Sequence, residues 1–315
     1  MVSIHVVDPE GRLEQGGEAL IDRPGIKWID VEGPDAPTLE HLATRFGLHK
    51  LAVEDCLHLD QRPKLEEYPN HLFVVMQSFT AAPDDLCALQ FHEMHFLLGP
   101  DWVISVHEQA SVACETARKR LQTEPGQTLG RGPDFAMYML ADALVDQNFS
   151  ILDRFNDELE DLEDRIFSAP EQRHLERISQ LKRSLVWVRR VLSPQRDIVG
   201  LLSRRGLPFV QERTTLYFRD VFDHLVRVYE QIEAGRDLVA NAMEAYLSVM
   251  ANRTNDITKQ LTIFASIFLP LSFLTGFFGQ NFEVLSQPIF LWGVVGLTVG
   301  LPVGLLGWFK YRGWL

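Results

Sequence analysis

The fold of this chain is decided by residues 261–281, LTIFASIFLPLSFLTGFFGQN, which include no charged side chain. A second uncharged run, residues 288–309, follows after a short polar link. An α-helix rises about 1.5 Å per residue, so each run can cross a hydrocarbon core of roughly 30 Å. The sequence therefore predicts two transmembrane helices, 261–281 and 288–309, joined by an outer loop of residues 282–287.

Basic residues flank this hairpin at both of its ends. Arg253 and Lys259 precede the first run, Lys310 and Arg312 follow the second, and the link carries only one charge, that of Glu283. The positive-inside rule places such basic flanks in the cytoplasm. We therefore expect a multi-pass protein of a bacterial-type inner membrane, with both termini and the tail 310–315 in the cytoplasm.

One narrow face of the first span is small or polar, whereas the residues between its members are large and apolar. Such a face suits either a seam between membrane helices or the wall of a pore, and periodicity alone leaves both open. Its one bulky member, Leu269, would be an apolar constriction in a pore. We call this face the stripe, and its members are Asn255, Thr258, Thr262, Ala265, Leu269, Ser272, Gly276 and Gly279.

The composition limits the possible partners and chemistry. A net charge of −13 over 315 residues argues against nucleic acid, whose binding proteins carry basic patches. Cys56, Cys87 and Cys114 lack metal-binding spacing and suggest reduced cytoplasmic thiols. His92 and His95 lie three apart on an expected strand, so they should point to opposite faces and not chelate together. The sequence contains no recognised enzyme motif, and we expect the protein to have no enzymatic activity.

Several segments resemble the CorA superfamily of divalent-cation channels. The residues NRTNDITKQLTIFASIFLPLSFLTGFFGQNF are similar to its first membrane helix, which normally ends in Gly-Met-Asn where this chain has Gly279-Gln280-Asn281. The related ZntB branch also varies the middle residue. Four further segments resemble family segments in the same order, namely WIDVEGP (28–34), HKLAVEDCL (49–57), QRPKLEEYPNHLFVVM (61–76) and YFRDVFDH (217–224).

The resemblance implies a homopentamer in the lipid bilayer, with five first spans lining a pore. A ring of Asn281 amides would be the filter, with Glu283 attracting cations outside. Mg²⁺ loses its water reluctantly, and neutral amide oxygens can bind the hydrated ion. Mg²⁺ is the expected substrate and regulator. Zn²⁺, or Co²⁺ or Ni²⁺, is the alternative, and a sensor or scaffold with little flux is a third interpretation.

The resemblance also implies regulatory metal ions between neighbouring cytoplasmic domains. By motif match the carboxylates are Asp220 and Glu244, and Asp84 and Asp85 are guesses for a partner acid. Hard cations prefer such oxygen ligands. An acidic helix, residues 153–164, could gather cations or be a solvated surface, with Phe155, Leu159 and Leu162 as its apolar stripe.

The chain as a whole is expected to be an α+β cytoplasmic domain (1–145), then a helical bundle and stalk (146–260), then the membrane hairpin. The resemblance implies a CorA-like funnel. Strands are expected at 3–7, 26–31, 71–79, 89–98 and 102–107, and helices at 37–46, 51–57, 110–121 and about 214–278. Breaks or helix starts are expected at Ala169-Pro170 and Ser193-Pro194, and Glu66 and Glu67 are expected in a solvated turn.

Overall fold

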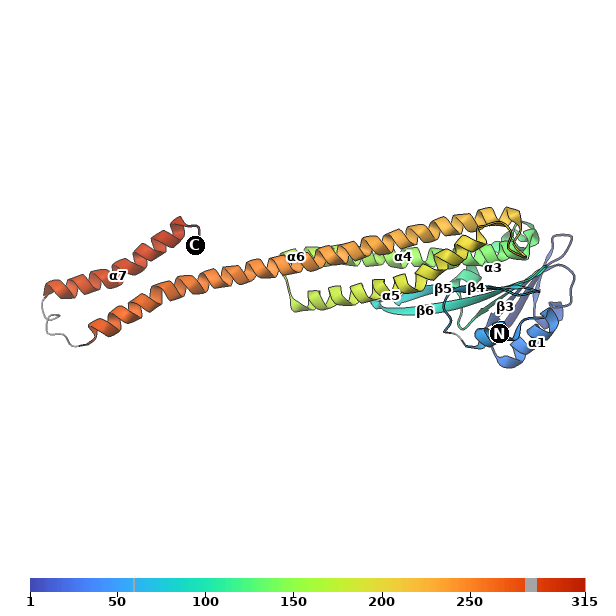
Figure 1. The fold of residues 1–315 in the computed structure, drawn as a ribbon, viewed down its shortest axis with the longest axis horizontal. Helices are drawn as coiled ribbons and strands as arrows, with labels where there is room; N and C mark the ends of the chain where they lie inside the picture. Colours follow the sequence, from blue (N-terminus) through green and yellow to red (C-terminus); the bar gives the residue numbers. More distant parts are fainter. Residues whose placement is uncertain (59, 281–287, 315) are drawn as a thin grey trace. The chain divides into compact units, whose positions relative to one another are not determined.

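The computed structural model describes residues 1–58, 60–280 and 288–314 (Figure 1). Its strands are β1 (Val2–Val7), β2 (Leu13–Gly16), β3 (Ile26–Glu32), β4 (Lys64–Glu67), β5 (Leu72–Ala82), β6 (Asp85–Leu98) and β7 (Trp102–His107). Its α-helices are α1 (Ala36–Phe46), α2 (Lys50–Leu57), α3 (Val112–Thr123), α4 (Pro133–Ser168), α5 (Gln172–Leu202), α6 (Glu212–Phe278) and α7 (Pro288–Tyr311). Three short 3-10 turns lie at Glu18–Leu20, Pro125–Gln127 and Leu129–Arg131.

The strands form one mixed sheet in the order β2-β1-β3-β7-β6-β5-β4. Only the β3–β7 pair is parallel among the strand pairs described, with Asp30 opposite Ser105. The long β5–β6 hairpin pairs Leu72 with Leu98 and continues to Thr80 and Gln90. Gly99 begins the turn into β7, where a Cβ atom would lie 2.2 Å from the Trp102 ring. A side chain at position 99 would therefore clash with Trp102 in this turn.

One face of the sheet packs against α1 and α2. Helix α1 is fixed at both ends, because the Asp35 side chain accepts the Thr38 N–H and Gly47 adopts a left-handed φ of 65°. Leu39 and Leu42 of α1 and Cys56 of α2 are buried in the resulting core. Burial of such side chains stabilises a domain by about 1.5–3 kcal/mol each.

The other face of the sheet is covered by the long helices. Gln195 of α5 is fully buried, accepts the Gln77 N–H at 2.6 Å and donates to the Gln77 carbonyl at 2.8 Å. Asn148 of α4 accepts the Phe79 N–H at 3.4 Å. These side chains satisfy buried backbone groups of β5 and so fix α4 and α5 to the sheet.

The structure agrees with most of the expected elements and corrects two expectations, one in α5 and one in β4. The expected break at residues 169–170 separates α4 from α5, and α6 covers the predicted stalk and the first span as far as Phe278. Pro194, however, lies inside α5, because one lost backbone hydrogen bond is offset by a well-packed helix. Glu66 and Glu67 belong to the edge strand β4 and not to a turn, because β4 pairs with β5. The buried residues Phe155, Leu159 and Leu162 form the predicted apolar face of α4.

Contacts divide the chain into two compact units. The first comprises residues 1–165 and 171–243, and we call it the cytoplasmic unit after the location that the basic flanks predict. The second, the membrane unit, comprises residues 166–170 and 244–315. The predicted boundaries at residues 145 and 260 fall within helices of this structure, α4 and α6, because both helices are continuous there.

Two helices of the membrane unit are long and apolar enough to cross a bilayer. They are the C-terminal part of α6 and, in α7, Leu291–Tyr311. Only 6 % of the most apolar window of α6 is buried, and none of that of α7. A buried hairpin of a soluble protein would hide these side chains in a core, so the exposed apolar surface supports membrane insertion.

Candidate ion pathway and cation site

The stripe lies along an exposed face of α6. All eight of its residues are exposed, and Leu269 retains 72 % of its accessible surface. The less exposed positions of the same span lie elsewhere on the helix, and Ile263 is its buried residue among those described. Contacts within the chain therefore bury another face of this helix and leave the stripe exposed. Near its N-terminal end the stripe borders a cavity lined by Asn255, Thr262 and Trp314.

The threonine hydroxyls of the stripe have a defined orientation. Thr258 donates its hydroxyl hydrogen to the Thr254 carbonyl, and Thr262 donates to the Thr258 carbonyl, each at 2.8 Å. A hydroxyl whose hydrogen is used in this way retains oxygen lone pairs as acceptors. The exposed side of each group can therefore accept hydrogen bonds from the waters around a cation.

The helix of the first span ends at the motif expected to form the filter. Gly279 donates its N–H to the Thr275 carbonyl at 2.9 Å, and Gln280 donates to Phe277 at 3.2 Å. Asn281 and Glu283, the predicted filter and outer-loop acid, lie outside the described residues. Ser272 faces outward on the stripe one helical turn after Leu269.

A group of possible cation ligands lies around Asp220, where α4 and α6 contact each other. The His224 Nε2 atom lies 3.9 Å from Asp220, while its Nδ1 atom lies 3.5 Å from Asp142 and 3.3 Å from Asp146. Potential ligand atoms of Asp142, Asp220 and His224 all lie within 4.8 Å of one another. Asp220 and His224 are one turn apart on α6, and Phe149 of α4 packs edge-on against the His224 ring.

The electrostatics of this cluster favour an added positive charge. Burial raises the pKa of Asp142, and the carboxylates of Asp146 and Asp220 raise it further, whereas His224 lowers it. The buried Oδ1 atom of Asp142 accepts no hydrogen bond in the described part of the chain. A divalent cation would satisfy that oxygen and remove the repulsion among three carboxylates.

The other predicted regulatory acids have different surroundings. Glu244 is exposed on α6, about seven helical turns beyond Asp220, so the two acids cannot share an ion within one chain. Asp85 pairs with Arg177 at 2.9 Å, and Arg177 also binds Glu158. Asp84 is exposed. The sequence did not indicate Asp142, which lies 78 positions before Asp220, and only the contact between α4 and α6 brings it close.

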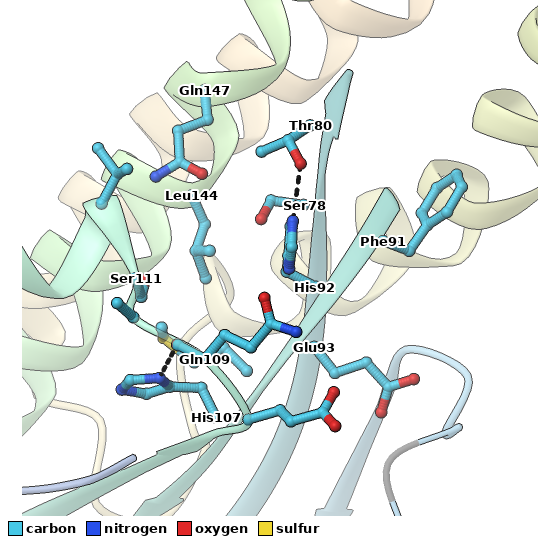
Figure 2. A pocket seen from close by; sticks show the side chains of 14 residues that line it. Ser78, Thr80, Phe91, His92, Glu93, His107, Gln109, Ser111, Leu144 and Gln147 are labelled. Atoms are coloured by element: carbon cyan, nitrogen blue, oxygen red, sulfur yellow. Dashed lines mark hydrogen bonds between the residues drawn. The ribbon is translucent and has the colours of Figure 1, made fainter. Parts of the chain in front are cut away.

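A further polar region lies beside the sheet under α4 (Figure 2). A cavity of about 110 Å³ is lined there by polar side chains that include His92, Glu93 and Gln147. His92 shares a hydrogen bond of 2.8 Å with Thr80, whereas the His95 Nε2 atom lies 3.1 Å from Glu93. The two histidines thus have separate partners and do not form a common metal site.

These features define a class of protein: a membrane protein with an N-terminal α+β unit, a continuous helix that includes a candidate membrane span, and a second candidate span after it. The sequence model of the family described as "CorA-like Mg2+ transporter protein" matches residues 24–311, and the chain belongs to that family. Its members are transporters or channels and not enzymes.

Known relatives agree with this assignment. The chain is 34 % identical over 292 residues to the cobalt/magnesium transport protein CorA of Thermotoga maritima, covering 91 % of this chain and 83 % of that protein. It is 25 % identical to the zinc transport protein ZntB of Yersinia pseudotuberculosis, covering 91 % and 88 % of the two chains. Its fold matches the complete CorA magnesium transporter of Methanocaldococcus jannaschii with a TM-score of 0.87, at 22 % identity, covering 100 % of this chain and 99 % of that one.

Proposed function

We propose that this chain is a passive Mg²⁺ channel of a bacterial-type inner membrane, built as a homopentamer. In this proposal five α6 helices turn their stripes toward a central water column, and both termini lie in the cytoplasm. The exposure of the stripe carries the proposal, because a face that the chain leaves uncovered is available to line a pore between copies. The inward-negative membrane potential would drive cation entry, at about 2.3 kcal/mol per charge per 100 mV.

The stripe and the filter would play different parts. Hydroxyl oxygens of Thr258, Thr262 and Ser272 would accept hydrogen bonds from the water shell of the ion, and Leu269 would form an apolar constriction. Asn281, together with Gly279 and Gln280, would form the selective outer ring. Glu283 would attract cations there. A neutral ring suits Mg²⁺, because it orients the hydrated ion without trapping it.

The cluster around Asp220 would hold a regulatory cation. When the ion leaves, Asp142, Asp146 and Asp220 repel one another, and the contact between α4 and α6 loosens. We propose that this loosening, together with loss of a separate ion at Glu244, favours an open pore. The observation in support is the buried Asp142 oxygen without a hydrogen bond.

Two other functions have specific support. Gln280 replaces the usual Met of the motif, and the similarity to a zinc transport protein makes Zn²⁺, Co²⁺ or Ni²⁺ the alternative cargo. The second is a sensor or scaffold with little flux, because an outer link with a single acid would attract cations only weakly. Flux measured with each ion separately distinguishes these functions.

Cysteine substitution tests the pore assignment. Thr262→Cys and Ser272→Cys lie on the stripe, whereas Phe264→Cys and Phe273→Cys are matched exposed positions off it. We expect a water-soluble thiol reagent to block flux through the two stripe variants and not through the two controls. Block of the phenylalanine positions alone would show that another face of α6 lines the pathway.

A further inference from the structure

A second cluster of possible metal ligands lies in the cytoplasmic unit, far in sequence from the ion pathway. Asp30 of β3, His107 of β7 and Cys114 of α3 are all buried, and their ligand atoms lie within 4.8 Å of one another. The parallel pairing of β3 with β7 brings the first two onto one face of the sheet. Helix α3, which begins at Val112, places the thiol above them.

The distances among these three atoms resemble the edges of a zinc tetrahedron. With Zn–S near 2.3 Å and Zn–N and Zn–O near 2.0 Å, tetrahedral edges are about 3.5 Å to sulfur and about 3.3 Å between nitrogen and oxygen. The Cys114 Sγ atom lies 3.5 Å from the His107 Nε2 atom and 3.4 Å from the Asp30 Oδ1 atom. The His107 Nε2 atom lies 3.0 Å from the same oxygen. Small shifts would admit an ion.

The groups around the cluster hold each ligand in a binding orientation. The His107 Nδ1 atom lies 2.6 Å from the Gln109 carbonyl oxygen (Figure 2), while the Nε2 atom on the other side of the ring contacts Asp30 and Cys114. The Arg118 guanidinium donates to Asp30 Oδ2, which leaves Oδ1 facing the thiol and the imidazole. Metal-binding histidines and carboxylates are commonly fixed by such outer hydrogen bonds. The Ser105 hydroxyl donates to Asp30 Oδ1 at 2.5 Å and accepts from the Trp28 indole N–H at 2.9 Å, which further fixes the Asp30 carboxylate.

We propose that Asp30, His107 and Cys114 bind one Zn²⁺ ion that fastens α3 to the sheet. A thiolate, an imidazole and a carboxylate together suit Zn²⁺ or Co²⁺ and discriminate against Mg²⁺, which requires an octahedron of oxygen ligands. The site is therefore distinct from the pathway and from the Asp220 cluster, both of which offer only oxygen and nitrogen donors. It does not depend on the ion that the pore conducts.

Cobalt spectroscopy of the full-length protein in detergent tests the proposal. Co²⁺ is added under reducing conditions with excess Mg²⁺, which occupies oxygen sites. A thiolate ligand gives a sulfur-to-cobalt charge-transfer band in the near ultraviolet, and we expect about one cobalt per chain to produce it. Zn²⁺ should abolish the band by displacement, and purified protein loaded with Zn²⁺ should retain about one zinc per chain after dialysis.

Cys56 offers a matched control, because it is as deeply buried as Cys114 but lies in an apolar core. We expect Cys114→Ser and His107→Gln to lose the band and the retained zinc, and Cys56→Ser to keep both. Circular dichroism shows whether each variant is folded. The absence of a thiolate band in the parent protein, or its persistence in folded Cys114→Ser, would overturn the proposal. Neither result bears on Mg²⁺ flux, which is measured separately.

Discussion

Two buried histidines of the sheet titrate far from their ordinary range. Neither ring nitrogen of His5 or of His71 has a hydrogen-bond partner among the described residues. Burial lowers the pKa of His71 to about 4, with a smaller contribution from His49, and burial lowers that of His5 to about 4 as well. Each side chain is therefore neutral in the folded protein at pH 5, whereas the unfolded chain would be protonated.

His71→Phe should make the cytoplasmic unit less sensitive to acid. The folded pKa lies below the unfolded value, so stability is complete above pH 6.5 and is lost as the pH falls toward 4. At pH 5 this loss amounts to about 1–2 kcal/mol for one such histidine. Phenylalanine keeps the ring contacts with Tyr68 and Trp102 and removes the titration. The loss of unfolding free energy between pH 7 and pH 5 should therefore shrink by that amount.

Denaturant unfolding of the full-length protein, followed by tryptophan fluorescence at both pH values, measures the effect. The exposed His41 supplies the control variant His41→Gln, which should behave like the parent. An equal loss of stability at pH 5 in His71→Phe and the parent would show that His71 is not responsible.

At this scale the sequence predicted residues that share one motif and missed residues that come together by folding. Asp220 was predicted from the resemblance of its segment to a family segment, and the stripe from helical periodicity. Asp142 lies on another helix, and the proposed zinc ligands Asp30, His107 and Cys114 lie on three different elements. Our expectation that the cysteines lack a metal-binding arrangement considered spacing along the chain only. Spacing cannot detect a site that depends on strand order, here the β3–β7 pair.

At the scale of elements, α6 is the feature that the sequence specified best. A long run whose only Gly and Pro residues are Gly235, Pro270 and Gly276, together with its charge-free end, predicted both the stalk and the first span, and α6 covers Glu212–Phe278. The short edge strands β2 and β4 were not predicted, because four residues carry too little alternation to be recognised. Their existence depends on pairing with β1 and β5, which is a tertiary effect.

Leu269→Asn should increase leak through the pore. Leu269 is the bulky apolar residue of the stripe and is exposed in the single chain, so asparagine there would hydrate a constriction formed by five copies. Ion flux under conditions that keep the parent closed should rise severalfold, measured in liposomes at equal protein density. Leu261→Asn, at an exposed apolar position off the stripe, is the control. A variant that assembles normally without added leak would place the constriction elsewhere.

Asp142→Asn and Asp220→Asn should weaken regulatory cation binding. Each removes one carboxylate from the cluster, and we expect the Mg²⁺ concentration that protects the cytoplasmic unit from proteolysis to rise about tenfold, which corresponds to roughly 1.4 kcal/mol. The like-charge repulsion relieved is on the order of 1 kcal/mol per close pair after solvent screening. Limited proteolysis across a Mg²⁺ titration gives the midpoint.

The matched control for that titration is Asp223→Asn, an exposed acid on the same helix. It should leave the protective Mg²⁺ concentration unchanged. If Asp142→Asn and Asp220→Asn also match the parent, these acids are ordinary surface carboxylates and regulation lies elsewhere.

For the whole molecule, sequence and structure agree on the class of protein. The α+β unit, the long helices and the two apolar helices were predicted, and the fold is that of complete CorA transporters. The number of copies, the orientation in the membrane and the transported ion are properties of the assembly. We propose them from the exposed stripe, from the basic flanks and from the family.

Ion flux into liposomes tests the central claim most directly. The protein is reconstituted, a potential negative inside is imposed, and uptake of Mg²⁺, Zn²⁺, Co²⁺ and Ni²⁺ is measured one ion at a time. We predict uptake of Mg²⁺ that is greater than that of the other three and that loses its selectivity in Asn281→Ala. Absence of flux for all four ions, with a correctly assembled protein, would contradict the channel function.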